Sequence, residues 1–101
     1  MASKGRKLRL ASSLNVAVLE QLSMKLNPSM IMKDYRSLAG RLKYTTEYIQ
    51  NFALERNPTL ALLQNWWSSN PETKTVAVLL NLLYCMERDD CVDLLRPYEF
   101  Y

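Results

Sequence analysis

The sequence predicts an all-α domain built from six short helices, and two observations support this prediction. The 101 residues include only two glycines and four prolines, too few for the many tight turns of a small β-rich domain. Apolar residues also recur at spacings of three and four along successive short segments, which is typical of amphipathic helices. With 49 % hydrophobic and 23 % charged residues, the chain has the composition and length of a single globular domain.

Three helices are expected in the first half of the chain. The first spans about residues 14–26 and ends before Pro28, because proline disfavours helical geometry in the residue before it. The second begins after Asp34, which can accept hydrogen bonds from backbone N–H groups at a helix start. Thr45 or Thr46 can cap the third. The connecting residues 30–32 (Met-Ile-Met) are expected to cover the core between the first two helices.

The second half of the chain predicts three more helices. Asn57-Pro58 indicates the start of the fourth, because proline is favoured at the first helical position. Thr75 can cap the fifth, which is apolar around most of its surface and is therefore expected to be central. Asp89 or Asp90 can cap the sixth. Ten side chains are expected in the core: Tyr35, Leu38, Ile49, Phe52, Leu63, Trp66, Val76, Leu80, Leu83 and Val92.

Residue types that are missing or rare argue against an enzyme. The chain has no histidine, which excludes Ser-His-Asp and Cys-His catalysis and the zinc sites that need histidine. Gly5 and Gly40 are too few for a glycine-rich phosphate loop. Cys85 and Cys91 are expected to be buried or half-buried free thiols in a reducing compartment. We therefore expect no catalytic residue, no cofactor and no metal.

The formal charge of +3 is unevenly distributed. The first ten residues contain four basic side chains and no acid, whereas the rest of the chain is nearly neutral. We expect residues 1–12 to form a flexible basic tail, residues 13–97 the folded domain and residues 98–101 a carboxy-terminal extension. The chain offers neither an apolar stretch long enough for a membrane span nor the apolar core of a signal peptide, so the expected location is the cytoplasm.

Two oppositely charged segments suggest a protein-interaction surface. Residues 25–43 carry a net charge of +4, and residues 87–93 carry −3. Subunits with complementary patches can stack head to tail into open helices or closed rings, and opposed charge then sets orientation and partner choice. The candidate interface residues are Lys33, Asp34, Arg36, Arg41, Lys43, Glu87, Arg88, Asp89 and Asp90. The alternative is that these charges only form a solvated surface.

The pair Trp66-Trp67 offers a second interface candidate. Adjacent residues of a helix point about 100° apart, so the two side chains cannot be buried equally. If Trp66 is buried, the residues that share its helix face include no amide, whereas burying Trp67 would also place the amide of Gln64 in the core. We therefore expect Trp66 to be buried and Trp67 to be partly exposed. Exposed tryptophan is enriched in binding hot spots; the alternative is that Trp67 packs against Lys74 or the loop at Pro71.

Several motifs resemble those of the death domain superfamily. The segment Asp34-Tyr35-Arg36-Ser37-Leu38-Ala39 is similar to its second-helix motif, with tyrosine where the family usually has tryptophan. Leu62-Leu63-Gln64-Asn65-Trp66 resembles its fourth-helix motif. The residues that resemble its fifth and sixth helices are Thr75-Val76, Leu79-Leu80, Leu83, Arg88-Asp89-Asp90, Val92 and Leu95. The resemblance covers residues 14–97.

Within the superfamily, the chain most resembles the death domains of adaptors that serve Toll-like and interleukin-1 receptors. The motifs that carry this resemblance are Leu22-Ser23, Leu26-Asn27, Asn57-Pro58-Thr59 and Arg88-Asp89-Asp90. The Toll/interleukin-1 receptor domain of such adaptors has no counterpart in this sequence.

The resemblance implies a six-helix antiparallel Greek-key bundle that assembles with other death domains into helical homo- and hetero-oligomers. The implied partners are further copies of the chain and the death domains of serine/threonine kinases of the interleukin-1 receptor-associated type. No small-molecule substrate, nucleic acid or membrane insertion is expected. Glu55 and Arg56 occupy a corner that the family uses between stacked subunits; alternatively, they are only solvated.

Two other functions remain open from the sequence. The chain could be the death domain of a downstream kinase or of another adaptor. It could also be a small helical nucleic-acid-binding domain whose basic arm contacts phosphates. The second alternative lacks its main feature, because the only strongly basic run lies in the amino-terminal tail and not in a recognition helix.

Overall fold

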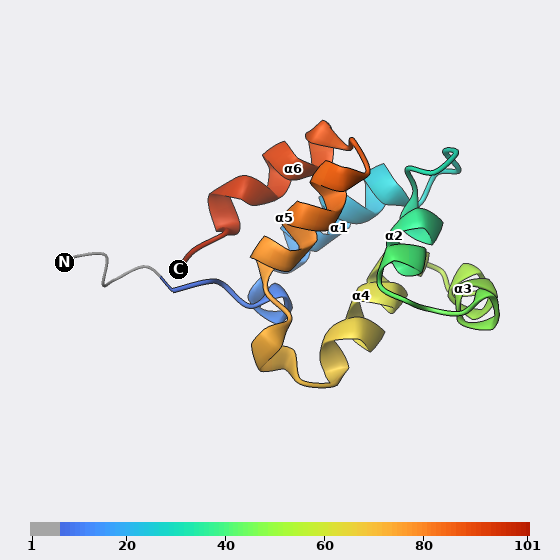
Figure 1. Cartoon of the computed structure of the whole chain (residues 1–101), viewed down its shortest axis with the longest axis horizontal. Helices are drawn as coiled ribbons and strands as arrows, with labels where there is room; N and C mark the ends of the chain where they lie inside the picture. Colours follow the sequence, from blue (N-terminus) through green and yellow to red (C-terminus); the bar gives the residue numbers. More distant parts are fainter. Residues whose placement is uncertain (1–6) are drawn as a thin grey trace.

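The computed structural model describes residues 7–101, which contain six α-helices (Figure 1). These are α1 (Val16–Leu26), α2 (Tyr35–Arg41), α3 (Thr46–Ala53), α4 (Pro58–Ser68), α5 (Val76–Cys85) and α6 (Asp89–Leu95). Three short 3₁₀ turns accompany them: η2 (Ala11–Ser13), η3 (Pro71–Thr73) and η4 (Arg96–Tyr98). The predicted all-α fold is confirmed.

Side-chain caps define where most helices begin. Asp34, Thr45, Asn57 and Thr75 each accept a hydrogen bond from a backbone N–H in the first turn of the helix that follows, as expected from the sequence. The prediction that Asp89 or Asp90 caps α6 is wrong. Arg88 holds the cap position without a side-chain cap bond, and the two expected aspartates lie inside the first turn, where acids are favoured by the helix dipole.

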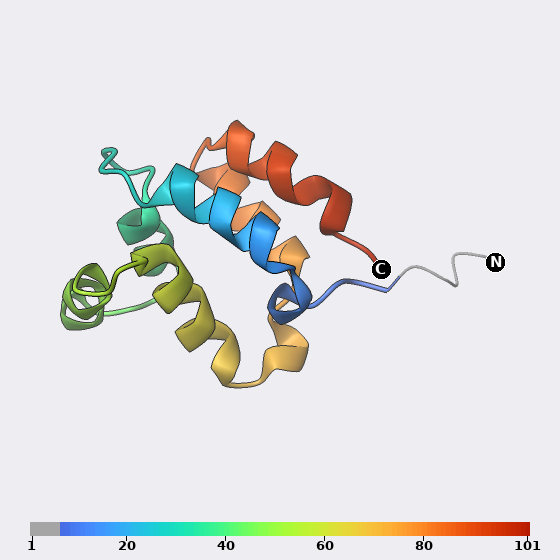
Figure 2. The ribbon, with the colours of Figure 1, turned by 180° about the vertical axis from the view of Figure 1, so that it is seen from behind.

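The core lies where α1, α4, α5 and α6 meet. Figure 2 shows α1 running between α6 and α4, and Figure 1 shows α5 and α6 side by side, joined by a short turn. Fully buried leucines line this region from several helices: Leu22, Leu26, Leu38, Leu62, Leu63, Leu79, Leu83 and Leu95. Burying large apolar side chains is the main stabilising contribution to such a bundle.

Eight of the ten expected core side chains are buried, and the other two lie at its edge. Ile49 and Leu80 are half-buried and pack against the core from α3 and α5. The helix α5 is less central than its composition suggested, because Val78, Tyr84 and Cys85 are exposed on its outer side. Its apolar surface exceeds what the neighbouring helices cover.

The amino-terminal segment is attached to the body, in contrast to the expected tail. Antiparallel bridges join Leu8 to Phe100 and Leu10 to Thr75, and Ala11 is fully buried. The guanidinium of Arg9 donates to the carbonyl oxygen of Tyr98 at 3.1 Å. Residues 7–12 and 98–101 therefore form one clasp; the part of the expected tail before residue 7 lies outside the described residues.

Candidate protein-interaction surface

The two oppositely charged segments lie next to each other in space. The ammonium nitrogen of Lys33 is 3.9 Å from a carboxylate oxygen of Glu87, and that of Lys25 is 3.9 Å from Asp90. Figure 1 shows the reason: the loop between α1 and α2 meets the turn between α5 and α6 at one end of the bundle. The expectation of two separate, complementary patches is therefore wrong, because the charges partly pair within one chain.

Arg88 is buried and is not available to a partner, contrary to expectation. Only 6 % of the residue is exposed. Its guanidinium donates to the carbonyl oxygens of Lys33 at 2.6 Å and Lys25 at 2.8 Å, and to both carboxylate oxygens of Asp90 at 3.0 and 2.9 Å. Arg88 therefore fastens both ends of the loop between α1 and α2 to the start of α6.

Asp34 is also buried and has a structural role. Its carboxylate accepts hydrogen bonds from the backbone N–H groups of Met30, Arg36 and Ser37 and lies 3.5 Å from the Nε of Arg36. These bonds satisfy donors at the start of α2 and close the loop that precedes it. The prediction that Asp34 caps the second helix is confirmed. The prediction that Asp34 contacts a partner is wrong, because the residue is buried.

The ion pair of Arg88 and Asp90 makes the stability of the domain sensitive to acid. The hydrogen bond from Arg88 lowers the pKa of Asp90 from 3.8 to about 2 and raises that of Arg88. Since the folded state then holds the proton less tightly than the unfolded chain, this stabilisation is present above about pH 4 and is lost as the pH falls through about 2. The Asp90 side chain is 46 % exposed, so we expect less than about 1 kcal/mol.

Urea unfolding at about pH 5 and about pH 2 tests this expectation. Asp90→Asn is expected to lose less free energy of unfolding than the wild type across this interval. Asp89→Asn, which changes the neighbouring exposed acid, is the control and should behave like the wild type. Equal acid sensitivity of the wild type and Asp90→Asn would contradict the assignment.

The other charged candidates are accessible. Arg36, Arg41, Lys43, Glu55, Arg56, Glu87, Asp89 and Asp90 are exposed, and Lys33 is half-exposed. They are distributed over the loop before α2, α2 itself, the two turns that flank α3, the turn before α6 and the first turn of α6. Their part in an interface remains a prediction.

An exposed apolar loop, which we call the tip (Met30, Ile31 and Met32), projects between α1 and α2. Ile31 is 89 % exposed, and the two methionines are 44 % and 74 % exposed. The expectation that these residues cover the core is wrong, because the loop turns outward: Met32 has a left-handed backbone with φ of 60°. The N–H of Lys33 donates to the carbonyl oxygen of Met30 at 3.0 Å and closes this turn.

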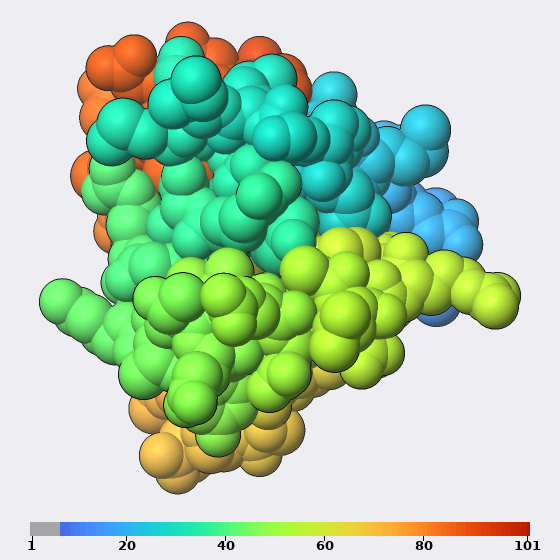
Figure 3. Space-filling view, turned by 90° about the vertical axis from the view of Figure 1, so that its right-hand side faces the viewer, coloured from blue at the N-terminus to red at the C-terminus, as the bar shows by residue number. Residues whose placement is uncertain are grey.

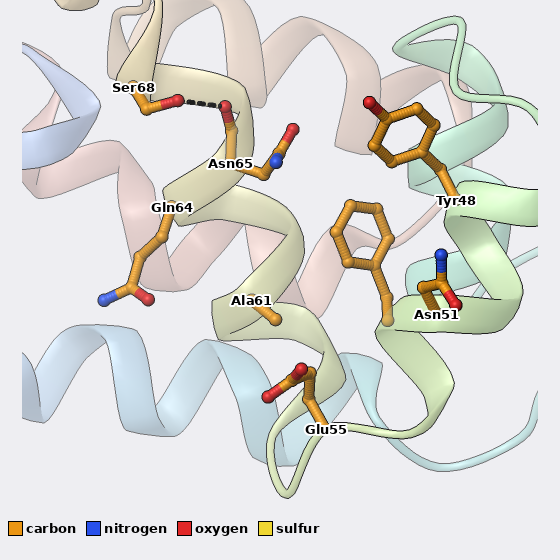
Figure 4. A pocket seen from close by; sticks show the side chains of 8 residues that line it. Tyr48, Asn51, Glu55, Ala61, Gln64, Asn65 and Ser68 are labelled. Carbon is orange, nitrogen blue, oxygen red and sulfur yellow. Dashed lines mark hydrogen bonds between the residues drawn. The ribbon is translucent and has the colours of Figure 1, made fainter.

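A groove of about 460 Å³ runs between α3 and α4 (Figure 4). Its walls are formed by Tyr48, Asn51 and Phe52 from α3 and by Ala61, Gln64, Asn65 and Ser68 from α4, with Glu55 at one end. Figure 4 shows the Tyr48 ring and the Asn65 amide on facing sides of this space. Sequence reasoning missed this groove, because no local pattern predicts how far apart two helices pack.

An aromatic cluster supports the α3 side of the groove. The ring of Tyr44 lies edge-on to that of Phe52, with centroids 5.2 Å apart, and is 5.5 Å from that of Tyr48. The Tyr44 hydroxyl donates to Oδ1 of Asn65 at 2.6 Å, and burial raises its pKa. These contacts link the start of α3 to α4, so the groove is preformed.

The two tryptophans differ in burial as the sequence predicts. Trp66 is 8 % exposed, whereas Trp67 is half-buried and packs against the edge of the core. The alternative for Trp67 was that it packs against Lys74. The ammonium of Lys74 instead lies 6.0 Å from the ring centroid of Trp66. A contact between Trp67 and a partner stays a prediction.

No group of histidine, cysteine and acidic side chains within residues 7–101 could hold a metal ion. Cys91 is buried as expected, and burial raises the pKa of its thiol to about 11, but Cys85 is exposed, which corrects the expectation for it. Within the same residues, no helix has the length and apolarity needed to cross a bilayer.

The fold and the surface together define a small helical protein-interaction module. The death domain family model matches residues 19–99, and the chain belongs to the death domain family. Two relatives named death domain-containing membrane protein NRADD, from Rattus norvegicus and Mus musculus, are each 33 % identical over 63 residues. This match covers 62 % of the chain but only 28 % of each relative. No solved structure matches the sequence.

Proposed function

We propose that the chain is a non-enzymatic adaptor module that assembles by homotypic contacts between death domains. The observation that carries this proposal is that one molecule presents both an exposed apolar projection and a groove that such a projection could enter. The tip is an apolar projection, and the groove between α3 and α4 is a preformed hollow with an aromatic wall. Ile31 of one copy would enter the groove of the next.

The charges around the two surfaces favour the same pairing. The acid Glu55 lines the groove, and Glu47 lines a smaller hollow beside it, while no basic side chain lines either of these described hollows. Lys33 follows the tip directly and remains half-exposed, although its ammonium already lies 3.9 Å from the exposed Glu87 of the same chain. In the proposed contact, Ile31 of one copy enters the groove of the next, and Lys33 beside it approaches the acids near that groove. Such opposed charges set the orientation of the contact and the choice of partner.

The placement of the two surfaces determines what kind of oligomer results. Figure 3 shows the loop before α2 above α3 and its following turn, so the tip and the α3 region occupy separate parts of one face. When the tip of one copy enters the groove of the next without a reciprocal contact, the arrangement is heterologous and leaves one free tip and one free groove in every complex. Such contacts propagate into open helices, or into rings where the rotation closes.

The partners and pathway are inferred from the sequence motifs. We propose that the oligomer recruits death domains of serine/threonine kinases of the interleukin-1 receptor-associated type, in the cytoplasm, downstream of Toll-like or interleukin-1 receptors. This part rests on the resemblance to the myeloid differentiation primary-response adaptor in Asn57-Pro58-Thr59 and Arg88-Asp89-Asp90. Measuring the stoichiometry of complexes with candidate kinase death domains tests it.

Replacing Ile31 by aspartate is expected to abolish self-assembly, because a carboxylate would have to be buried in the groove without a partner. Light scattering as a function of concentration should show only monomer, while far-UV circular dichroism stays helical. Val16→Asp is the matched control: it places the same charge at an apolar position on α1 that is 69 % exposed, against 89 % for Ile31. Assembly of Ile31→Asp like that of the control would contradict the tip as a contact.

A mixing experiment tests the heterologous geometry directly. Asn51→Arg places a bulky cation at the exposed wall of the groove and should also give a monomer. Because Ile31→Asp keeps its groove and Asn51→Arg keeps its tip, an equimolar mixture should form a one-to-one complex and nothing larger. Sedimentation showing no complex in the mixture would exclude the proposed pairing.

A further inference from the structure

The tip carries two methionines on either side of its apex. Met30 and Met32 are 44 % and 74 % exposed, and Met24 on α1 is 75 % exposed, whereas Met86 is 2 % exposed in the core. A thioether is apolar and adapts its shape to a partner surface, and methionine is used in adaptable binding surfaces for this reason. The same exposure leaves both sulfur atoms open to oxidants in solution.

We propose that Met30 and Met32 form an oxidation site that switches off the assembly of the domain; this inference rests on the proposed function. The oxidant is hydrogen peroxide. The sulfur attacks one peroxide oxygen, the O–O bond breaks, an S–O bond forms and water leaves after proton transfer. The sulfur loses two electrons to the peroxide, and the product is methionine sulfoxide, which dedicated reductases can convert back.

The sulfoxide changes the tip without changing the fold. The loop is fastened at its base by bonds that involve no sulfur: Arg88 holds the carbonyl oxygens of Lys25 and Lys33, and Asp34 accepts from the N–H of Met30. Neither tip methionine belongs to the buried core. Oxidation therefore converts an apolar projection into a polar one on an intact domain.

The polar tip no longer matches the groove. A sulfoxide is far more polar than a thioether, and removing it from water is unfavourable wherever the groove does not return a hydrogen bond. The possible donors in the groove are the hydroxyls of Tyr48 and Ser68 and the side-chain amides of Asn51, Gln64 and Asn65, whereas Phe52 and Ala61 offer only apolar surface. We expect each sulfoxide to weaken the contact at least about tenfold.

The test uses the 101-residue chain with Cys85→Ser, because the exposed Cys85 thiol lines the same hollow as Met32 and would also react. The protein is treated with hydrogen peroxide, and mass spectrometry of its peptides locates the added oxygen. Oxygen is expected on both tip methionines and on the exposed Met24 before Met86; the control variant with both tip methionines replaced by leucine, which keeps Met24, separates the effect of the tip from that of Met24. Light scattering should show loss of the assembly at unchanged helicity, and methionine sulfoxide reductases should restore it.

The control variant adds Met30→Leu and Met32→Leu, which keep the tip apolar and remove the sulfur. It is expected to assemble both before and after peroxide. The switch is overturned if the oxidised tip still assembles, or if the leucine variant loses assembly to the same extent. A protein that is monomeric before any treatment would instead refute the proposed function, and the switch with it.

Discussion

Replacing Leu79 by alanine is expected to lower the free energy of unfolding by about 2–5 kcal/mol. Leu79 on α5 is fully buried in the core, so the substitution removes apolar contacts and leaves a cavity that the surrounding helices fill only in part. Since a domain of this size is stabilised by only about 5–15 kcal/mol, the loss is a large fraction of the total. Equilibrium unfolding in urea, followed by circular dichroism, measures it.

Leu54→Ala is the matched control for this experiment. It makes the same chemical change at a leucine that is 83 % exposed just after α3, and its effect should stay within about 0.5 kcal/mol. A similar loss in both variants would contradict the assignment of Leu79 to the core, because the difference between the two depends only on burial.

Replacing Arg88 by methionine is expected to cost about 2–4 kcal/mol. The substitution keeps an unbranched apolar stem but removes the guanidinium, and so leaves the carbonyl oxygens of Lys25 and Lys33 without the donor that they have in the wild type. Urea unfolding measures the stability loss. Faster hydrogen exchange of backbone N–H groups in residues 27–33 would show that the loop between α1 and α2 has been released.

Two other variants separate the roles of Arg88. Arg88→Lys keeps the charge but not the planar fork that reaches two carbonyls and a carboxylate, so an intermediate loss is expected. Arg56→Met removes an exposed arginine and should change stability by no more than about 0.5 kcal/mol. If Arg88→Met were as stable as Arg56→Met, the structural role of the buried guanidinium would be excluded.

Most of the helices could be predicted from the sequence because their signals are local. Asp34, Thr45, Asn57 and Thr75 cap helices through hydrogen bonds that span only two or three residues, and such bonds depend little on the rest of the fold. The burial of Trp66 also followed from its position relative to neighbours on the same helix.

The candidate site depended on long-range contacts that no local pattern contains. Arg88 looked like one more surface charge, yet it is buried because the loop between α1 and α2 lies across it. The residues of the tip looked like core-covering residues because they are apolar, yet they project outward. For Arg88 the deciding contacts join residues that are far apart in the sequence. The tip instead turns outward through the left-handed backbone of Met32, which its apolar composition did not predict.

The uneven charge shows the same division. The sequence by itself determined how many charges there are, which segments carry them and which helices these segments form, since all three depend on residue identity and local spacing. Only the tertiary structure decided that the basic and acidic segments meet at one end of the bundle, that residues 7–12 join the folded body, and that a groove lies between α3 and α4. The physical reason is that the packing of whole helices sets these distances, and packing minimises exposed apolar surface over the entire chain.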